Sequence, residues 1–201
     1  MNDLLDIKLS NIDKLKWLPF VGSEYFNNSC DNRLMIIGES HYLSEKDFSS
    51  GMDKNLSLTR DIVDWIGIKK NYGRTRFFQN LYLALFQKDK IDLPRFWEMI
   101  SFYNFVQRPM KTRKSRPSAN DFINGWEVFF ELVEILKPNK CIFIGTSASK
   151  YRNTAISKSN FTIVNFKKAE KISRTRPRIL TIKNKAKCMF GGALRLITKA
   201  L

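Results

Sequence analysis

The residues of this sequence that are best suited to chemistry follow directly after a short apolar run. Residues 33–42 read Arg-Leu-Met-Ile-Ile-Gly-Glu-Ser-His-Tyr, so Glu39 and His41, the only histidine of the chain, stand two positions apart. A carboxylate and an imidazole can both take part in proton transfer. The same pattern also fits a turn or a helix cap, in which Ser40 is the capping residue and His41 is simply exposed.

An apolar run that ends in glycine is typical of a buried parallel strand. Such strands are apolar on both faces, and the residues just beyond their carboxyl ends line the crevice in which open α/β sheets bind ligands. Residues 140–145 repeat the pattern, and Ser147 follows at an expected helix N-terminus. Further strands are expected at residues 100–106, 161–166 and 178–183, which are rich in β-branched and aromatic side chains.

Segments with helical spacing separate these strands. They predict helices at residues 56–68, 76–87 and 118–136, and a last helix from residue 191 onward. Strands that alternate with helices indicate an α/β fold. We therefore expect a three-layer α/β/α sandwich with a mainly parallel central sheet of about four strands.

Size and composition fit one domain. The chain has 201 residues, 43% of them hydrophobic, so we expect a single domain over residues 1–201 on which an N-terminal segment, residues 1–30, packs. Its three cysteines lie far apart and predict neither a disulfide framework nor a metal site. No apolar run reaches membrane-spanning length and the start is acidic. We expect a soluble, cytoplasmic monomer with no cofactor.

The net charge of +16 is the strongest signal of the composition. Excess lysine and arginine attract polyanions, and phosphate backbones are the natural partner. The charge gathers in residues 108–116 and 167–187, where proline, serine and threonine interrupt it and apolar segments flank it. This pattern predicts basic loops on a scaffold that contacts nucleic acid. The alternative is a surface that is basic without specialisation.

Two further positions are candidates for ligand contact. Asn104 lies inside an apolar and aromatic run, and a buried asparagine must be hydrogen-bonded, either to the protein or to a ligand. Phe77 and Phe78 are neighbours on an expected helix and point about 100° apart. One of them could therefore stack on a ligand, or both could be buried between layers.

Taken in order, these pieces resemble the uracil-DNA glycosylase superfamily, most closely its bacterial and archaeal branch with a Gly-Glu-Ala-Pro-Gly first motif. Residues 38–42, Gly-Glu-Ser-His-Tyr, stand where that motif follows the first strand. Residues 103–106, Tyr-Asn-Phe-Val, resemble the Thr-Asn motif of the second strand, and residues 113–117 resemble its basic Arg-x-Pro loop. A Leu-Lys-Pro end to the long helix and an apolar strand follow. The resemblance covers residues 33–151 well and the rest loosely.

The resemblance implies a DNA partner and a role for each candidate residue. Glu39 would orient or activate water near a sugar that gains positive charge, and Asn104 would read the edge of a base flipped out of DNA. The implied catalytic residues are Glu39, His41 and Asn184. The implied base-binding residues are Ser40, Tyr42, Phe77, Phe78 and Asn104. The implied phosphate-binding residues are Arg108, Lys111, Arg113, Lys114, Arg116, Ser147, Lys185 and Lys187.

Three departures from the family pattern leave several hypotheses open. The last strand of the family delivers a His-Pro-Ser motif, whereas here residues 182–187 read Ile-Lys-Asn-Lys-Ala-Lys. Asn184 or Lys185 could substitute for that histidine, or His41, which replaces the proline of the first motif, could do so. The cysteines that hold an iron–sulfur cluster in the most similar branch are absent.

The first hypothesis is a hydrolase that removes uracil or another damaged base from DNA. The second is a non-catalytic relative that binds nucleic acid with the same fold. The third hypothesis takes Gly-Glu-Ser-His alone, which also resembles esterase-like and haem-uptake proteins with a Gly-Glu-x-His start, but those need further histidines. The fourth hypothesis is a hydrolase of another nucleotide-like substrate.

Overall fold

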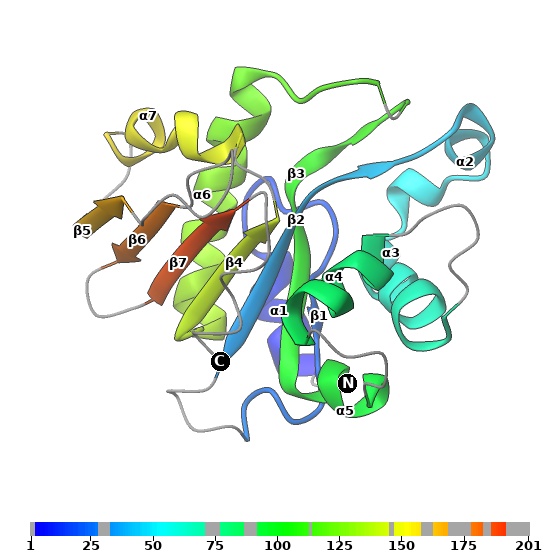
Figure 1. Cartoon of the computed structure of the whole chain (residues 1–201). Helices are drawn as coiled ribbons and strands as arrows, with labels where there is room; N and C mark the ends of the chain where they lie inside the picture. The colour runs from blue at the N-terminus through cyan, green and yellow to red at the C-terminus, as the bar shows by residue number, and fades with distance from the viewer. Residues whose placement is uncertain are drawn as a thin grey trace.

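A computed structural model of the chain describes residues 3–27, 33–70, 77–86, 92–112, 114–144, 147–157, 163–168, 178–182 and 186–191. Within these residues the chain has an α/β fold built around one open, mixed sheet (Figure 1). Its strands pair in the order β1-β3-β2-β4-β7-β6-β5. They are β1 (Phe20–Val21), β2 (Leu34–Tyr42), β3 (Ile100–Met110), β4 (Lys140–Ile144), β5 (Ile163–Lys168), β6 (Arg178–Ile182) and β7 (Ala186–Gly191).

Short helices and one long helix connect the strands of the described chain. The α-helices are α1 (Asp3–Ser10), α2 (Glu45–Ser49), α3 (Leu58–Ile62), α4 (Phe77–Phe86), α5 (Leu93–Met99), α6 (Ala119–Leu136) and α7 (Arg152–Ile156). A π-helical turn, η3 (Val63–Ile68), continues α3, and the 3₁₀ turns η2 (Met52–Lys54) and η4 (Ser147–Lys150) precede α3 and α7.

The centre of the sheet is parallel and its margins are antiparallel. β2 pairs in parallel with β3 on one side and with β4 on the other, and β4 pairs in parallel with β7. β1 is antiparallel to β3, and β6 is antiparallel to both β5 and β7. The expectation of a mainly parallel sheet of about four strands thus describes the four central strands and is wrong for the described sheet as a whole.

Connection length explains this difference. Parallel neighbours need a crossover of about a dozen residues or more. Only residues 183–185 separate β6 from β7, and residues 169–177 separate β5 from β6. Both connections are too short for a crossover, so these strands pair as antiparallel neighbours.

Helices pack against both faces of the central strands. Because side chains alternate along a strand, Met35 and Ile37 of β2 point to one face and Leu34 and Ile36 point to the other. The first pair belongs to a core cluster with α6 and the N-terminal segment, and the second pair to a cluster with α4, α5 and η3. In Figure 1, α4 and α5 lie in front of the sheet and α6 lies behind it.

Several expected elements are confirmed within a few residues, and two strands, β1 and β7, were missed. The helices predicted at residues 76–87 and 118–136 correspond to α4 and α6, and the strands predicted at 140–145 and 178–183 correspond to β4 and β6. β7 was not expected, because residues 186–191 were assigned to a basic loop and a helix start. The predicted last helix lies outside the described residues beyond Gly191.

The start of α6 is fixed by a capping box and an ion pair. The Ser118 hydroxyl accepts from the backbone N–H of Asp121, and the Asp121 carboxylate accepts from the backbone N–H of Ser118. The Arg108 guanidinium on β3 donates to both carboxylate oxygens of Asp121, at 2.9 and 2.6 Å. This pairing holds the pKa of Asp121 at about 2 and ties the end of β3 to α6.

Gly125 provides a test of how closely α6 packs on β3. A Cβ at this position would lie 2.6 Å from two ring carbons of Phe105 and 2.7 Å from its carbonyl oxygen. Alanine favours a helix over glycine by about 1 kcal/mol, but overpacking a rigid core costs about 1–3 kcal/mol. We expect Gly125→Ala to lower the free energy of unfolding measured by urea denaturation. Asn124→Ala, at the exposed neighbouring position, is the control and should be neutral or slightly stabilising; equal stabilisation by both variants would contradict the close packing.

Candidate functional site

The carboxyl end of β2 lies at a point where the strand order reverses. From β2 the chain continues to β3 on one side and then returns to β4 on the other side. Open α/β sheets bind ligands in the crevice outside the strand ends at such a point. A small pocket lies here, lined by Ile37, Gly38, Glu39, Phe105, Phe122, Phe143, Ile144, Ser147 and Ala148.

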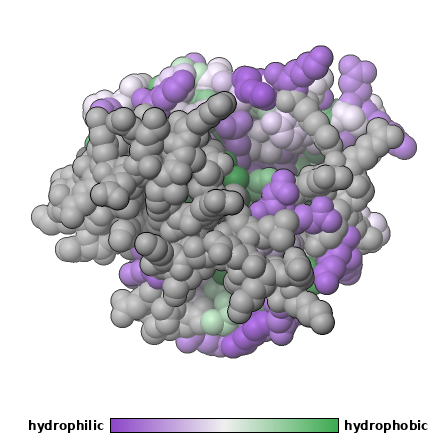
Figure 2. Space-filling model, in the orientation of Figure 1, coloured by the Kyte–Doolittle hydropathy of each residue, from purple (hydrophilic) through white to green (hydrophobic). Residues whose placement is uncertain are grey.

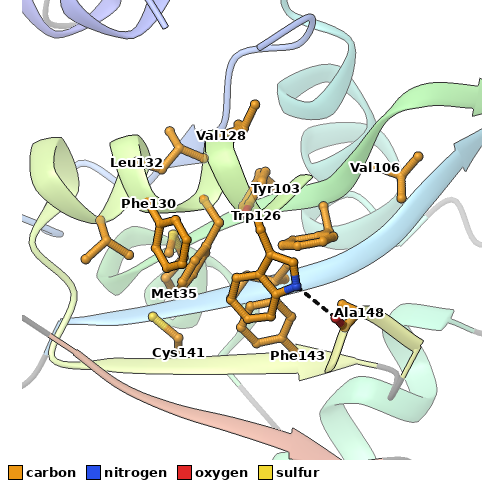
Figure 3. Close-up of a cluster of buried hydrophobic side chains, with 14 of the residues drawn as sticks. Met35, Tyr103, Val106, Trp126, Val128, Phe130, Leu132, Cys141, Phe143 and Ala148 are labelled. Atoms are coloured by element: carbon orange, nitrogen blue, oxygen red, sulfur yellow. Dashed lines mark hydrogen bonds between the residues drawn. The ribbon is translucent and has the colours of Figure 1, made fainter. Parts of the chain in front are cut away.

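Aromatic side chains from three elements form the pocket wall. Phe105 comes from β3, Phe122 from α6 and Phe143 from β4. The rim at η4 is held in place by Trp126, whose indole N–H donates to the carbonyl oxygen of Ala148 at 2.8 Å (Figure 3). The pocket has about 220 Å³ of empty space including its open mouth.

Among the described residues that line this pocket, Glu39 is the titratable one. It follows Ile37 by two positions on β2 and therefore points to the same face of the sheet, toward α6. Its side chain is half-buried, and Ser147 lines the same pocket. The structure thus brings together one predicted catalytic residue and one predicted phosphate-binding residue, while the predicted roles of both stay predictions.

His41 is buried, although the sequence suggested either an exposed residue or a donor at the edge. Its side chain is 4% exposed, its Nε2 atom lies 2.9 Å from the Thr59 hydroxyl, and its Nδ1 atom lies 3.0 Å from the Asn104 amide nitrogen. The Trp17 ring meets the imidazole edge to face at 5.0 Å between centroids. Burial without a charged partner lowers the pKa of His41 from 6.5 to about 4, so the imidazole is neutral at pH 7.

Asn104 lies beside Gly38 in the parallel pairing of β2 and β3. It is 8% exposed, and its backbone carbonyl accepts from the Gln107 side chain at 2.6 Å. Registered neighbours point to the same face, and Asn104 shares its face with Phe102, which packs toward α4. Asn104 therefore lies on the opposite face of the sheet from the Glu39 pocket, and the two predicted functional groups flank the end of β2 from different sides.

The other predicted base-binding residues have different environments. Phe78 is 3% exposed and contacts Tyr82, Trp97 and Phe102 in the core. Phe77 is half-buried against Phe78, so this pair fits the reading in which both rings pack between layers. The remaining two are Tyr42, which is 44% exposed at the end of β2, and Ser40, whose hydroxyl is buried.

The basic segment, residues 108–116, begins in the last residues of β3 and runs along the carboxyl edge of the sheet toward the start of α6 (Figure 1). Lys111, Lys114 and Arg116 are exposed on it. Arg108 is also exposed but is engaged by Asp121. Figure 2 shows purple, hydrophilic surface along the upper edge of the molecule, beside a hollow with hydrophobic surface inside. Arg113 lies outside the described residues.

The interpretation of the last strand is wrong. It assumed that the strand at residues 178–183 delivers functional residues to the edge near Glu39, but β6 is antiparallel to β7 and does not pair with β4. Lys187 on β7 pairs with Lys140 at the amino end of β4, which is the opposite edge of the sheet from Glu39. Asn184 and Lys185 lie outside the described residues.

Sequence reasoning missed the residues that surround His41 and those that form the pocket wall. Gln107 accepts from the backbone N–H groups of Lys16 and Trp17 at 3.0 and 3.1 Å, which docks the N-terminal segment beside His41. Trp17 and Thr59 lie 24 and 18 positions from His41 along the chain, so no local pattern could indicate them. For Phe105 and Phe143 the available signal was their position near the carboxyl ends of apolar strands.

Metal and membrane sites have no support among the residues described. No group of three or more histidine, cysteine, aspartate or glutamate side chains in this part of the chain could hold a metal ion. Within the same residues, no helix has both the length and the apolar character needed to cross a membrane. Cys141 is buried and forms no disulfide with another described cysteine.

Comparison with protein-family models and with curated protein sequences finds no match for this chain.

The burial of His41 predicts a pH dependence of stability. The folded protein keeps the imidazole neutral down to about pH 4, whereas the unfolded chain protonates it near pH 6.5. Between these values the unfolded state binds more protons, so the contribution of His41 is complete above pH 6.5 and falls as the pH is lowered toward 4. The expected slope is at most about 1.4 kcal/mol per pH unit.

Urea denaturation at a series of pH values measures this slope, with His41→Asn as the comparison. The variant should lose the part of the slope between pH 6.5 and pH 4 and keep the part that Asp121, with its pKa of about 2, contributes at lower pH. A variant that retained the wild-type slope throughout would contradict the burial of a neutral imidazole.

Proposed function

We propose that this chain is a glycosylase-like hydrolase that cleaves the N-glycosidic bond of uracil or another damaged base in DNA. One observation carries the proposal. Glu39 is a half-buried carboxylate at the carboxyl end of the central strand, where the strand order reverses, in a pocket with aromatic walls. The four parallel central strands with helices against both faces are compatible with the three-layer fold of the uracil-DNA glycosylase superfamily.

The chemistry of this bond needs a group like Glu39. Cleavage builds positive charge on the deoxyribose and negative charge on the departing base, so a fixed carboxylate near the sugar lowers the barrier. A carboxylate in a pocket that holds water can also orient the attacking water molecule. In this proposal Glu39 acts on the sugar and the water. The base lies beyond the end of β2, where Asn104 contacts it from the face of the sheet opposite Glu39.

The basic segment would supply the contact with the DNA backbone. Lysine and arginine side chains fix the position of a nucleic acid through phosphate contacts, which carry no sequence information. Lys111 and Lys114 are exposed just beyond Met110, which ends β3 and pairs with Tyr42 at the carboxyl end of β2. Arg108 contributes less in this proposal because Asp121 already accepts from two of its three guanidinium nitrogens, Nε and Nη2.

A non-catalytic protein that binds nucleic acid is the second candidate, and the state of His41 favours it. Its imidazole is neutral, buried and hydrogen-bonded through both ring nitrogens. A group in that state is a poor proton donor for a departing base. If no other donor serves the reaction, the fold would bind DNA without cleaving it.

Glu39→Gln separates the two candidates. The experiment incubates labelled oligonucleotides that carry uracil, hypoxanthine, xanthine or an oxidised base with the protein, then uses alkali to reveal abasic sites. Cleavage by the wild type should fall by about 10²-fold or more in Glu39→Gln, with DNA affinity retained. Glu24→Gln, a half-buried glutamate near the amino end of β3, is the matched control and should cleave normally. Binding without cleavage by the wild type would favour the second candidate.

Salt dependence tests the basic segment under both candidates. Replacing Lys111 and Lys114 by glutamine should reduce the slope of log affinity against log salt by about 2 on double-stranded DNA, because each lost phosphate contact releases about one counterion fewer. Lys8→Gln with Lys137→Gln removes the same charge from exposed sites on α1 and at the far end of α6. An equal loss in both double variants would indicate a nonspecific effect of net charge and no defined contact.

A further inference from the structure

We propose that His41 is a positioning residue: together with Thr59 it fixes the amide of Asn104, so that the Asn104 carbonyl oxygen is presented to a hydrogen-bond donor of the ligand. The proposal deepens the proposed function, on which it rests for the statement that the ligand is a nucleobase. The role differs from the proton donation that the sequence suggested for His41.

The first step of the argument is the tautomer of His41. The Asn104 amide nitrogen, 3.0 Å from Nδ1 of His41, carries only hydrogens to offer, so Nδ1 must be the acceptor. A neutral imidazole has one proton, which then sits on Nε2 and is donated to the Thr59 hydroxyl at 2.9 Å. The chain of donors therefore runs from Asn104 to His41 and from His41 to Thr59.

The second step concerns the side-chain oxygen of Asn104, which the hydrogen bonds from Asn104 to His41 and from His41 to Thr59 do not use. If the Asn104 amide rotated by half a turn, its oxygen would take the place of its N–H donor. That oxygen would then face the lone pair of His41 Nδ1, which is unfavourable. The Oδ1 atom lies toward Gly38, where a Cβ on any other residue would come within 2.1 Å of it. Among the described residues, no hydrogen bond to this Oδ1 atom is formed. The glycine thus makes room for an acceptor at the carboxyl edge.

The third step is a second polar group at the same strand end. Ser40 follows Gly38 by two positions on β2 and pairs with Val106 of β3, two positions after Asn104. The Oγ atom of Ser40 is buried and has no hydrogen-bond partner within the described part of the chain. Buried polar groups are normally paired, so an acceptor and an unpaired hydroxyl at one strand end point to a ligand with complementary groups.

The chemistry of that ligand follows from the polarity of Asn104. A carbonyl oxygen without a partner in the protein accepts from an N–H group of a ligand and is left unpaired by a ligand that lacks one. Uracil and hypoxanthine carry a ring N–H, which methylation of that nitrogen removes. A site with this polarity should therefore bind a base with a ring N–H more tightly than the same base methylated at that nitrogen.

The first test needs no ligand and no activity. Nitrogen NMR of the labelled protein at pH 7 distinguishes the two neutral tautomers of a histidine. We expect His41 to be the tautomer protonated on Nε2, and Thr59→Val to disturb that signal while Thr59→Ser preserves it. A proton on Nδ1 would mean that the Asn104 amide is turned over, which would overturn the proposal.

The second test measures selectivity in the Glu39→Gln background, so that binding is observed without cleavage. The probes are one oligonucleotide with uracil and the same oligonucleotide with 3-methyluracil. We expect a preference for uracil of about tenfold, the scale of one hydrogen bond in a desolvated site. His41→Leu should abolish the preference, and His41→Asn, which keeps an acceptor near the Nδ1 position, should restore part of it.

The outcomes separate this proposal from the proposed function. Binding of neither oligonucleotide would reject the nucleic-acid function, while the NMR result would still decide the tautomer. A preference for uracil that survives in His41→Leu would overturn the positioning role. If His41→Leu does not fold, as judged by circular dichroism, Thr59→Val and its matched control Thr59→Ser give the same comparison, and equal selectivity in both would overturn the role.

Discussion

The parallel pairing of β2 between β3 and β4 is the constraint on which the rest of this structure depends. It buries β2 on both faces, so the chain can present polar chemistry only where the strand ends. Neighbouring strands lie about 4.8 Å apart, which places Asn104 directly beside Gly38 and Phe143 beside Ile37. The two faces of the strand end therefore acquire different surroundings, an aromatic pocket around Glu39 on one and a hydrogen-bonded amide on the other.

Desolvation decides the state of the only imidazole in the chain. Taking a charged imidazole out of water is costly unless a carboxylate compensates it. Among the described residues, His41 contacts the Thr59 hydroxyl, the Asn104 amide and the Trp17 ring, and none of these groups carries charge. Neutrality follows from this environment, and two hydrogen bonds then fix the ring in one orientation. A residue held in this way is better able to orient a neighbour than to exchange protons.

Electrostatics at the carboxyl edge combine structural and free charges. The Arg108–Asp121 pair stabilises the junction of β3 and α6, and its carboxylate also completes the cap of α6. The lysines that follow Arg108 extend into solvent and keep their charge available for polyanions. The sequence presents these residues as one basic cluster, whereas the structure separates a cation that holds the fold together from cations that are exposed.

The sequence by itself determined the α/β class, the central strands β2, β3 and β4, the long capped helix α6, and the position of Glu39 at a strand end, because apolar periodicity and capping residues are local signals. Only the tertiary structure decided the direction of β7, the environment of His41 and the aromatic wall of the pocket. Trp17, Thr59 and Gln107 reach the site from distant parts of the chain. Packing between segments far apart in sequence leaves no local pattern, so burial and hydrogen-bond partners emerge only when the chain is folded.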